Sequence, residues 1–379
     1  MPTQYEIRPV DSSSLQKKFM SFIWDLYRGD ENWIPPLRQN QLELVGFRPH
    51  PFYERNKIKT FLAYRDGVPA GRIAAIVNYG HVERYNENRG FFGFFDCINE
   101  QQVANLLFRE AGLFLKSQGM DSVRGPANPS LNHEIGCLVE GFDTPPTFMM
   151  TYNPPYYDEL IRGWGFEKVQ DLYSYEADAS MLDKLDPKMR FVIEEVKRRF
   201  NVQVRPINRK RFMDDVRIFL NIYNRSLEGT WGFVPMTENE VEHSAKGLKM
   251  LIEPDITSFI EVDGRTVGAG LGLLDYNPRI KEIDGRLFPF GFLKLLFGRK
   301  KLTRVRLMST NVLPEFQRWG LGIVTLDRML PDCLKRGITH AEFSWVLESN
   351  DLSRGSLERG GAKRAKTYRL YDRSLTDIS

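Results

Sequence analysis

The chain has 379 residues, which is too long for one ordinary hydrophobic core and fits two domains of a little under 200 residues. Its 42% hydrophobic and 27% charged residues are typical of a soluble globular protein, and the net charge of +4 is too weak to indicate nucleic acid binding. Three widely spaced cysteines and scattered histidines argue against a disulfide framework and a metal site, and no apolar run reaches the roughly 20 residues of an integral membrane segment. The N-terminus lacks a secretory pattern, so we expect a cytoplasmic protein.

The first half of the chain predicts strands and helices in a regular order. An Asp66-Gly67 turn between apolar runs is typical of a β-hairpin, and Gly119 ends a helical pattern. We expect loops at 35–51 and 125–155, which are rich in Pro, Gly and Asn. The expected elements are a strand at 5–10, a helix at 15–27, hairpin strands at 61–64 and 71–77, a strand at 90–97, a helix at 101–117 and a strand at 120–124.

The second half predicts a similar series after a basic helix at 188–200. An Asp263-Gly264 turn again indicates a hairpin. Residues 276–300 have no counterpart in the first half and contain the apolar stretch LFPFGFLKLLF beside GRKK. The other expected elements are a strand at 202–206, helices at 211–228 and 237–252, a strand at 304–312, a helix at 322–336, a strand at 339–347, a short helix after Asn350 and a strand at 367–371.

Three segments of the first half recur in the second half at offsets of 196 to 198 residues. The pairs are IRPV and VRPI, TFLAYRDGVPAGRIAAI and SFIEVDGRTVGAGLGLL, and RGWGFEKVQDLYSYE and ERGGAKRAKTYRLYD. A repeat of this length indicates a duplicated domain, so we predict domains at 1–180 and 181–379. Each is expected to be of the α/β (α+β) class, with a mixed, mostly antiparallel sheet flanked by helices.

Only the second copy carries a loop suited to an anion, VLPEFQRWGLG at 312–322, where the first copy has DCINEQQ. Gly320 and Gly322 open a helix directly after a strand, so backbone N–H groups can approach an anion at the positive end of the helix dipole. Gln317 and Arg318 add side-chain donors. A dinucleotide site of the G-x-G-x-x-G type is disfavoured because the third position is Thr325.

The loop resembles the acetyl-CoA signature V-x-P-x-x-Q-x-x-G-x-G of the GNAT family of N-acetyltransferases. Val312, Pro314, Gln317, Gly320 and Gly322 stand at the family spacing. The resemblance implies that the backbone of 308–312 pairs with pantetheine and that the amides of 317–322 hold the pyrophosphate of acetyl-CoA or a longer acyl-CoA, without a metal. It implies a cofactor-binding set of Met308, Asn311, Val312, Gln317, Arg318, Trp319, Gly320, Leu321, Gly322 and Asn350.

The catalytic groups are less well defined by the resemblance. The family's usual general acid, a tyrosine seven residues after Asn350, is replaced by Leu357. Tyr368 and Tyr371 are the nearest substitutes, with Tyr368 the proposed acid, or else both are core aromatics of their strand. Glu348, at the end of a strand, is the proposed base, or else a solvated carboxylate.

The acceptor side also leaves alternatives open. Asn224, Trp231 and Phe233 lie where family members line the substrate pocket, although Trp and Phe can also form a hydrophobic plug. In the first copy, Asn128, Asn132, His133 and Glu134 belong either to an acceptor site or to a loop held by Asn turns. The apolar insertion is an acyl-chain flap, a membrane-touching surface helix or an inter-domain contact.

The sequence therefore predicts an N-acyltransferase that moves an acetyl or other acyl group from acyl-CoA to a small-molecule or peptide amine. The first copy, without the loop, would support the pair or complete the acceptor pocket. Two alternatives remain open: a non-catalytic acyl-CoA sensor, and a Fem-like aminoacyl transferase, against which the intact CoA loop counts. The sequence does not define the oligomeric state.

Overall fold

The computed structural model of the chain describes residues 2–180 and 187–378. These residues form two compact units. The first contains the chain up to Leu172, the segment Ile280–Pro289 and the chain from Lys366 onward, and the second contains Tyr173–Arg279 and Phe290–Ala365. Both units are discontinuous in sequence, and the domain boundary expected between residues 180 and 181 stays a prediction.

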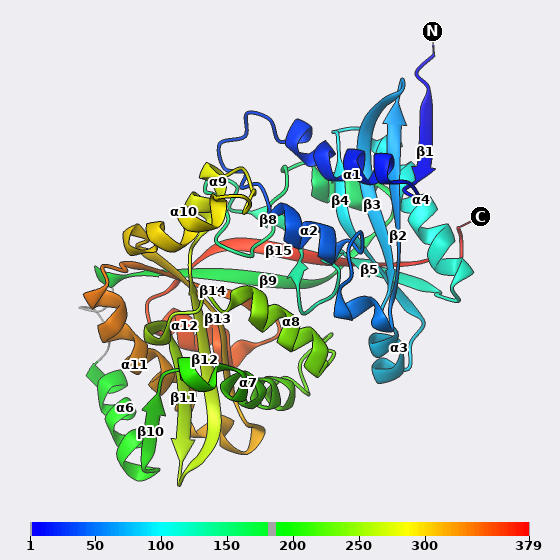
Figure 1. The fold of residues 1–379 in the computed structure, drawn as a ribbon. Coiled ribbons are helices and arrows are strands. Elements are labelled where there is room, and N and C mark those ends of the chain that lie inside the picture. The colour runs from blue at the N-terminus through cyan, green and yellow to red at the C-terminus, as the bar shows by residue number, and fades with distance from the viewer. Residues whose placement is uncertain (1, 181–186, 379) are drawn as a thin grey trace. The chain divides into compact units, whose positions relative to one another are not determined.

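The first unit contains a mixed sheet in the order β1-β2-β3-β4-β5-β15 (Figure 1). Neighbouring strands are antiparallel except β4 and β5, which are parallel. The strands are β1 (Tyr5–Pro9), β2 (Lys57–Arg65), β3 (Val68–Val77), β4 (Arg89–Cys97), β5 (Ser122–Gly125), β15 (Lys363–Ser374) and the short β6 (Ala127–Asn128), β7 (Glu134–Ile135) and β8 (Cys137–Glu140). The helices are α1 (Ser13–Leu26), α2 (Arg38–Leu44), η1 (Pro51–Glu54, a 3-10 helix), α3 (Tyr79–Tyr85), α4 (Gln101–Ser117) and α5 (Tyr157–Gly163).

The core of the first unit forms because α4 presents an apolar stripe to the sheet. Leu107, Phe108 and Leu115 are buried on this helix, which packs against β2 and β3. Phe92 of β4 contacts Phe108 with ring centroids 5.2 Å apart. The apolar residues of the helix recur every three to four residues and those of the strands alternate, so both sets face one shared core.

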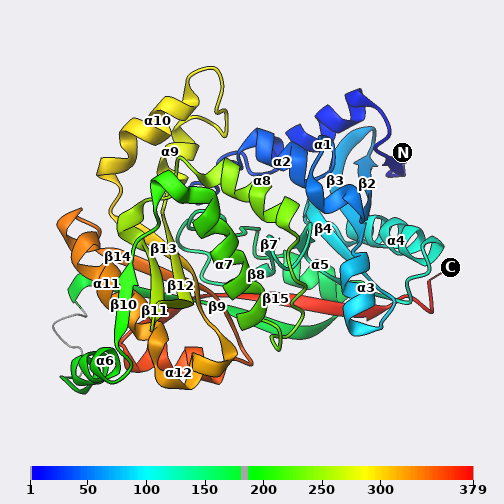
Figure 2. The same cartoon turned by 60° about the horizontal axis from the view of Figure 1, so that its bottom comes forward.

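The second unit repeats this plan in the order β10-β11-β12-β13-β14-β9, again with one parallel pair, β13 and β14, among the five strands β10–β14. Helix α7 packs against β12 and β13, and α11 packs against β10 to β13 (Figure 2). The strands are β9 (Glu167–Asp178), β10 (Val202–Arg205), β11 (Thr257–Val262), β12 (Arg265–Leu274), β13 (Arg304–Val312) and β14 (His340–Leu347). The helices are α6 (Pro187–Arg199), α7 (Phe212–Ser226), α8 (Glu238–Leu248), α9 (Asn277–Glu282), α10 (Gly291–Gly298), α11 (Leu321–Lys335), α12 (Asp351–Arg359) and the 3-10 helices η3 (Arg209–Arg211), η4 (Pro254–Ile256), η5 (Arg299–Lys301) and η6 (Pro314–Trp319).

The sixth strand of each unit comes from the other half of the sequence. Strand β9 ends the first repeat, enters the second unit at Tyr173 and is the neighbour of β14. Strand β15 ends the second repeat, enters the first unit at Lys366 and pairs antiparallel with β5, with Tyr371 opposite Gly125. The predicted fold class and duplication are confirmed, and the two repeats exchange their last strands.

The two segments expected to be loops contain short elements, and a short helix also forms in the apolar insertion, for which a surface helix was one of the alternatives. Helix α2 forms inside 35–51, with Gln41 and Leu44 buried three residues apart on one face. Strands β6, β7 and β8 form inside 125–155, and α10 forms inside 276–300. These elements have two to eight residues, too few for a periodic pattern to be read from sequence.

Candidate functional site

The site begins where β13 and β14 stop pairing. Their parallel register runs from Arg304 opposite His340 to Leu307 opposite Phe343, and each strand then continues to its own end. On its other edge β13 has a β-bulge, since Leu271 pairs with Ser309 and Gly272 with Leu307. A bulge bends a strand and re-aims its backbone groups. The β14-facing edge of 308–312 is therefore where a strand-like ligand can pair.

The glycine loop lies at the end of this strand. Gly320 is the N-cap of α11. Its φ of +73° is a left-handed backbone conformation, which favours glycine. A Cβ at Gly322 would meet Thr310 Cγ2 at 3.6 Å, an ordinary contact. The first N–H groups of a helix have no partner within the helix and carry its positive dipole end. The loop thus presents a helix N-terminus of the kind that suits an anion, at the end of β13.

Two contacts fix the loop. The side-chain amide of Gln317 donates to the carbonyl oxygens of Val312 (3.1 Å) and Ser226 (3.2 Å). Trp319 stacks on Phe200 with ring centroids 3.9 Å apart. Both amide protons of Gln317 are therefore engaged by the protein, so its expected role as a side-chain donor to the ligand is not supported by this geometry. Its backbone remains a predicted contact, as does that of Trp319.

The other predicted cofactor-binding residues surround the loop. Met308 is half-buried, Arg318 is exposed and Leu321 is buried. Asn311 is buried, and its amide donates to the hydroxyl of Ser309. Asn350 caps α12 by accepting a hydrogen bond of 3.0 Å from the N–H of Ser353. Their contacts to CoA stay predictions.

A buried polar group that the sequence did not reveal lies beside the last β13–β14 pairs. Arg306 and Glu342 are partners in the register, and their exposed fractions are 2% and 1%. Ser344 joins them, accepting from Arg306 Nε at 2.9 Å and donating to Glu342 Oε1 at 2.7 Å. In a low-dielectric interior such a satisfied network holds its members in one arrangement. It therefore fixes the two strands close to where they stop pairing.

The two predicted catalytic residues belong to different units. Glu348 directly follows β14 in the second unit and is half-buried, and its backbone carbonyl accepts 2.6 Å from Arg354 Nη1. Tyr368 lies in the first unit on β15, fully buried opposite Leu138 of β8. This buried position fits the alternative role of Tyr368 as an aromatic side chain of the core. Both catalytic roles stay predictions.

Two tyrosines of the exchanged strand lie in the unit that holds the loop. Tyr173 and Tyr175 of β9 form a cluster with Val346 of β14, against which Leu357 packs. The Tyr175 hydroxyl donates to Glu358 Oε1 at 2.8 Å, and burial together with this carboxylate raises its pKa. Leu357 occupies the sequence position of the family's acid, so these phenols lie beside that position. Sequence spacing could not indicate them because they come from the other repeat.

Two of the three residues predicted to bind the acceptor make contacts within their own segment and with α7. Asn224 donates to the Met236 carbonyl at 3.0 Å and accepts from the Met236 N–H at 3.1 Å. Phe233 is buried against Tyr223, with ring centroids 5.6 Å apart, and Trp231 is half-buried. Asn224 and Phe233 thus attach 229–236 to α7, and a substrate-binding role for the three residues stays a prediction.

The first unit has a similar strand arrangement, but its own chain fills the corresponding place. Strand β4 stops pairing with β5 at Phe91 and then has a bulge around Phe94. Asn128 of β6 accepts a hydrogen bond of 2.6 Å from the Phe94 N–H. A Cβ on Gly93 would lie 1.9 Å from the Ala127 carbonyl oxygen, which shows how closely β6 approaches. Asn128 therefore has a structural partner in the loop.

The described residues contain no group of three or more His, Cys, Asp or Glu that could hold a metal ion. None of the described helices has the length and apolar character to cross a bilayer. All three cysteines are buried thiols, and burial raises the pKa of Cys333 to about 11.

Two curated proteins are similar to almost the whole chain. Protein YghO of Escherichia coli is 35% identical over 365 residues, which cover 95% of this chain and 93% of that protein. The bacterial ceramide synthase of Caulobacter vibrioides is 33% identical over 384 residues, covering 97% of each chain. No family model matches the chain.

Two solved structures with a similar fold are GNAT proteins. A tandem GNAT protein from the clavulanic acid biosynthesis pathway aligns over 99% of this chain and all of its own, with a TM-score of 0.57 and 9% identity. A glucosamine N-acetyltransferase region of a fungal multi-domain β-N-acetylglucosaminidase aligns over 98% of this chain and 38% of its own, with a TM-score of 0.58 and 15% identity. The predicted resemblance to tandem GNAT proteins is confirmed at the level of the fold.

Proposed function

We propose that this chain, which belongs to the family of Escherichia coli YghO and the bacterial ceramide synthase of Caulobacter vibrioides, is an acyl-CoA-dependent N-acyltransferase with its cofactor site in the second unit. One observation carries the proposal. Strand β13 stops pairing with β14 directly before a glycine loop that opens α11. This places a strand edge and an anion-binding helix terminus in succession, as a pantetheine chain ending in a pyrophosphate requires.

The residues of the chain would bind and orient the two substrates. Bound acyl-CoA supplies an activated thioester. The neutral amine attacks the thioester carbonyl, so that a C–N bond forms, the C–S bond breaks, the amine nitrogen loses a proton and the departing thiolate gains one. The backbone of 308–312 would orient the acyl arm, and the N–H groups at Gly320 and Gly322 would hold the diphosphate.

Proton transfer needs a base and an acid. Glu348 is the proposed base, since it follows β14 in the unit that holds the loop. Tyr175 is a proposed acid alongside the predicted Tyr368, because its hydroxyl carries a proton and Leu357 packs against its cluster. Tyr175 and Glu348 share a unit, whereas Tyr368 does not.

One of the two relatives supports a fatty acyl donor and a long-chain amine acceptor. A ceramide is an amide between a fatty acid and the amino group of a long-chain base, so a ceramide synthase performs the N-acylation proposed here. The protein of that name is 33% identical over 97% of this chain. We therefore propose fatty acyl-CoA rather than acetyl-CoA as the preferred donor.

A second candidate is an acyl-CoA-binding protein without turnover. It is favoured by one observation, that Leu357 stands where the family has its acid and packs in an apolar cluster. In that case the site would bind acyl-CoA and release no CoA in the presence of an amine.

Two measurements on the full chain test both candidates. Calorimetric titration with acetyl-CoA and palmitoyl-CoA measures binding, and a thiol reagent measures CoA released from palmitoyl-CoA with sphinganine as the amine. Binding with amine-dependent thiol release and an amide product supports the enzyme. Binding without release at any amine concentration supports the sensor, and absence of binding to either thioester overturns both.

A further inference from the structure

Two exposed phenylalanines belong to helix α10, which Figure 1 labels: Phe290 is its N-cap and Phe297 lies in its last turn. Phe290 and Phe297 have exposed fractions of 72% and 79%, and Lys294 between them is also exposed. Lys294 and Phe297 are three residues apart on α10 and therefore share one side of the helix, while Leu295 on another side is buried. Large aromatic residues gathered on the surface generally mark a site of interaction.

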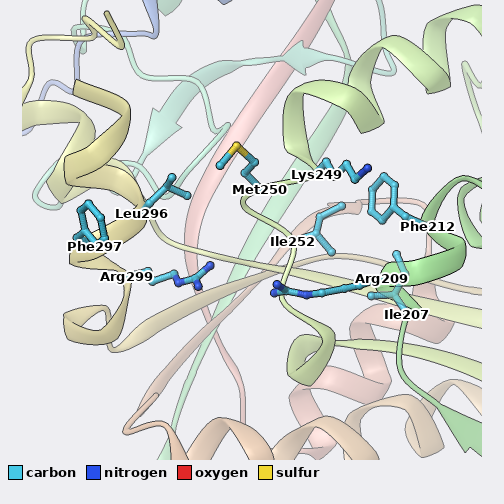
Figure 3. A pocket seen from close by; sticks show the side chains of 9 residues that line it. All are labelled: Ile207, Arg209, Phe212, Lys249, Met250, Ile252, Leu296, Phe297 and Arg299. Carbon is cyan, nitrogen blue, oxygen red and sulfur yellow. The ribbon is translucent and has the colours of Figure 1, made fainter. Parts of the chain in front are cut away.

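A hollow of about 450 Å³ lies beside this helix in the same unit (Figure 3). Its apolar side includes Leu296, Phe297 and Met250, of which Met250 is 59% exposed. Lys249, which precedes Met250, is also part of the lining and is exposed. The exposed apolar face of α10 therefore continues into a hollow with a basic edge.

Two arginines, Arg209 and Arg299, line the hollow and contribute positive charge to it. Figure 3 shows Arg209 and Arg299 extending toward each other from opposite sides. Both bind Glu253, at 3.2 Å and 2.8 Å, and Arg336 binds the same carboxylate at 3.2 Å and Asp255 at 3.1 Å. The three arginines therefore carry three positive charges against the two negative charges of Glu253 and Asp255, and Lys249 adds a fourth positive charge. Positive charge remains in excess at the hollow.

We propose that this face of the second unit docks the protein on a bilayer rich in anionic phospholipids. Phe290, Phe297 and Met250 would enter the headgroup boundary, and Lys249, Lys294, Lys300 and Lys301 would lie against lipid phosphates, with one headgroup phosphate in the hollow. Phenylalanines with adjacent basic residues are typical of surfaces that bind at the membrane interface. Helix α10 has eight residues, too short to span a bilayer, so it lies in the interface.

Charge complementarity selects a membrane over an apolar protein partner. Lys300 and Lys301 are exposed and directly follow α10 in sequence. Lys249, next to Met250, is exposed as well. A protein partner with a matching hydrophobic groove would favour apolar or neutral residues between the two phenylalanines, where this chain has Lys294. The inference goes beyond the proposed catalytic activity, since it concerns where the protein binds rather than what it converts.

The test is vesicle flotation with the full chain. Vesicles of phosphatidylcholine alone are compared with vesicles containing about one third phosphatidylglycerol, at low and high salt. We expect binding to the anionic vesicles, reduced by salt, and a decrease of about tenfold or more in the partition coefficient for Phe290→Ser/Phe297→Ser and for Lys249→Glu/Lys294→Glu/Lys300→Glu. Leu352→Ser and Lys363→Glu are matched controls, since both residues are exposed in the same unit outside this surface, and they should bind like wild type.

Three results would overturn the docking proposal. These are no binding of the wild type to anionic vesicles, equal binding to both vesicle types, and unchanged binding of both variant sets. Calorimetry with soluble CoA, performed on the same variants, checks that they are folded and tests the cofactor site separately. Vesicle binding with no CoA binding would leave the docking surface standing and overturn the proposed function, and the reverse result would do the opposite.

Discussion

The side-chain oxygen of Asn128 accepts a 2.6 Å hydrogen bond from the backbone N–H of Phe94, at the bulge where β4 has left β5. In the first unit an internal amide thus pairs with the strand edge that corresponds to the proposed pantetheine-binding edge of β13. The first unit lacks the glycine loop as well. Two independent features therefore argue that this copy does not bind a cofactor.

We expect one molecule of CoA to bind per chain. The edge near Phe94 is occupied by β6, whereas the edge at 308–312 follows the end of the β13–β14 register. Calorimetric titration of the intact protein should give a stoichiometry of one. Two equivalent sites would contradict the assignment of the first unit as a filled copy.

The variant Gly322→Ala should weaken CoA binding about tenfold or more, because the added methyl group would stand where backbone N–H groups approach the diphosphate. The fold should tolerate it, since the new Cβ would be 3.6 Å from Thr310 Cγ2. Gly229→Ala is the matched control, because nothing lies within 4 Å of a Cβ built there. Calorimetry on both variants checks the prediction, and equal affinities would move the anion site away from this loop.

Replacing Tyr175 by Phe should reduce turnover about a hundredfold while leaving CoA affinity unchanged, if its phenol protonates the departing thiolate. The raised pKa of Tyr175 implies that the acid stays protonated above the ordinary tyrosine range, so the alkaline fall in the pH–rate profile should lie above pH 10. Tyr368→Phe is the comparison. A rate loss confined to Tyr368→Phe would return the acid to the residue predicted from the sequence.

Alkaline pH should destabilise the protein through Tyr223. Burial raises the pKa of this phenol from 10 to about 12, so the unfolded chain ionises first as the pH rises. The free energy contributed by the neutral phenol is complete below pH 10 and decreases above it, by about 1.4 kcal/mol at pH 11. Urea unfolding at pH 9 and pH 11 should show this loss for the wild type beyond that of Tyr223→Phe. Equal losses would contradict the raised pKa.

Neither half of the sequence should fold alone. A fragment of residues 181–379 lacks β9 beside β14 and the tyrosines that pack on Val346. A fragment of 1–180 lacks β15 beside β5. We expect both to be aggregated or largely unfolded by circular dichroism, with folding recovered on co-expression. A soluble 181–379 fragment that binds CoA would disprove this dependence.

Much of the fold follows from local sequence signals. The Asp66-Gly67 and Asp263-Gly264 turns were predicted from their residues, and all four have positive φ values, as a tight hairpin turn requires. The strand predicted at 304–312 and the helix predicted at 101–117 match β13 and α4. The turn residues and the long periodic segments predict their local structure directly, so no tertiary contact is needed to recognise them.

Strand exchange and the occupied edge of the first unit could not be predicted in this way. The apolar pattern of β9 is satisfied equally by either sheet, so nothing in YSYE shows that it joins β14. The contact of Asn128 with Phe94 links residues in separate elements, through a side chain that also reads as a turn former. Likewise, the partnership of Arg306 with Glu342 depends on the register of two strands that are far apart in sequence.

The exchange of β9 and β15 also bears on the history of the gene. After duplication, a copy that has lost its catalytic role can usually be deleted without harm to the other. Here the copy without a cofactor loop supplies the strand beside β14, which brings Tyr173 and Tyr175 to the other copy's site. If the proposed function is correct, selection on the copy with the cofactor loop would therefore also preserve the copy without it, and the pair would be inherited as a single unit.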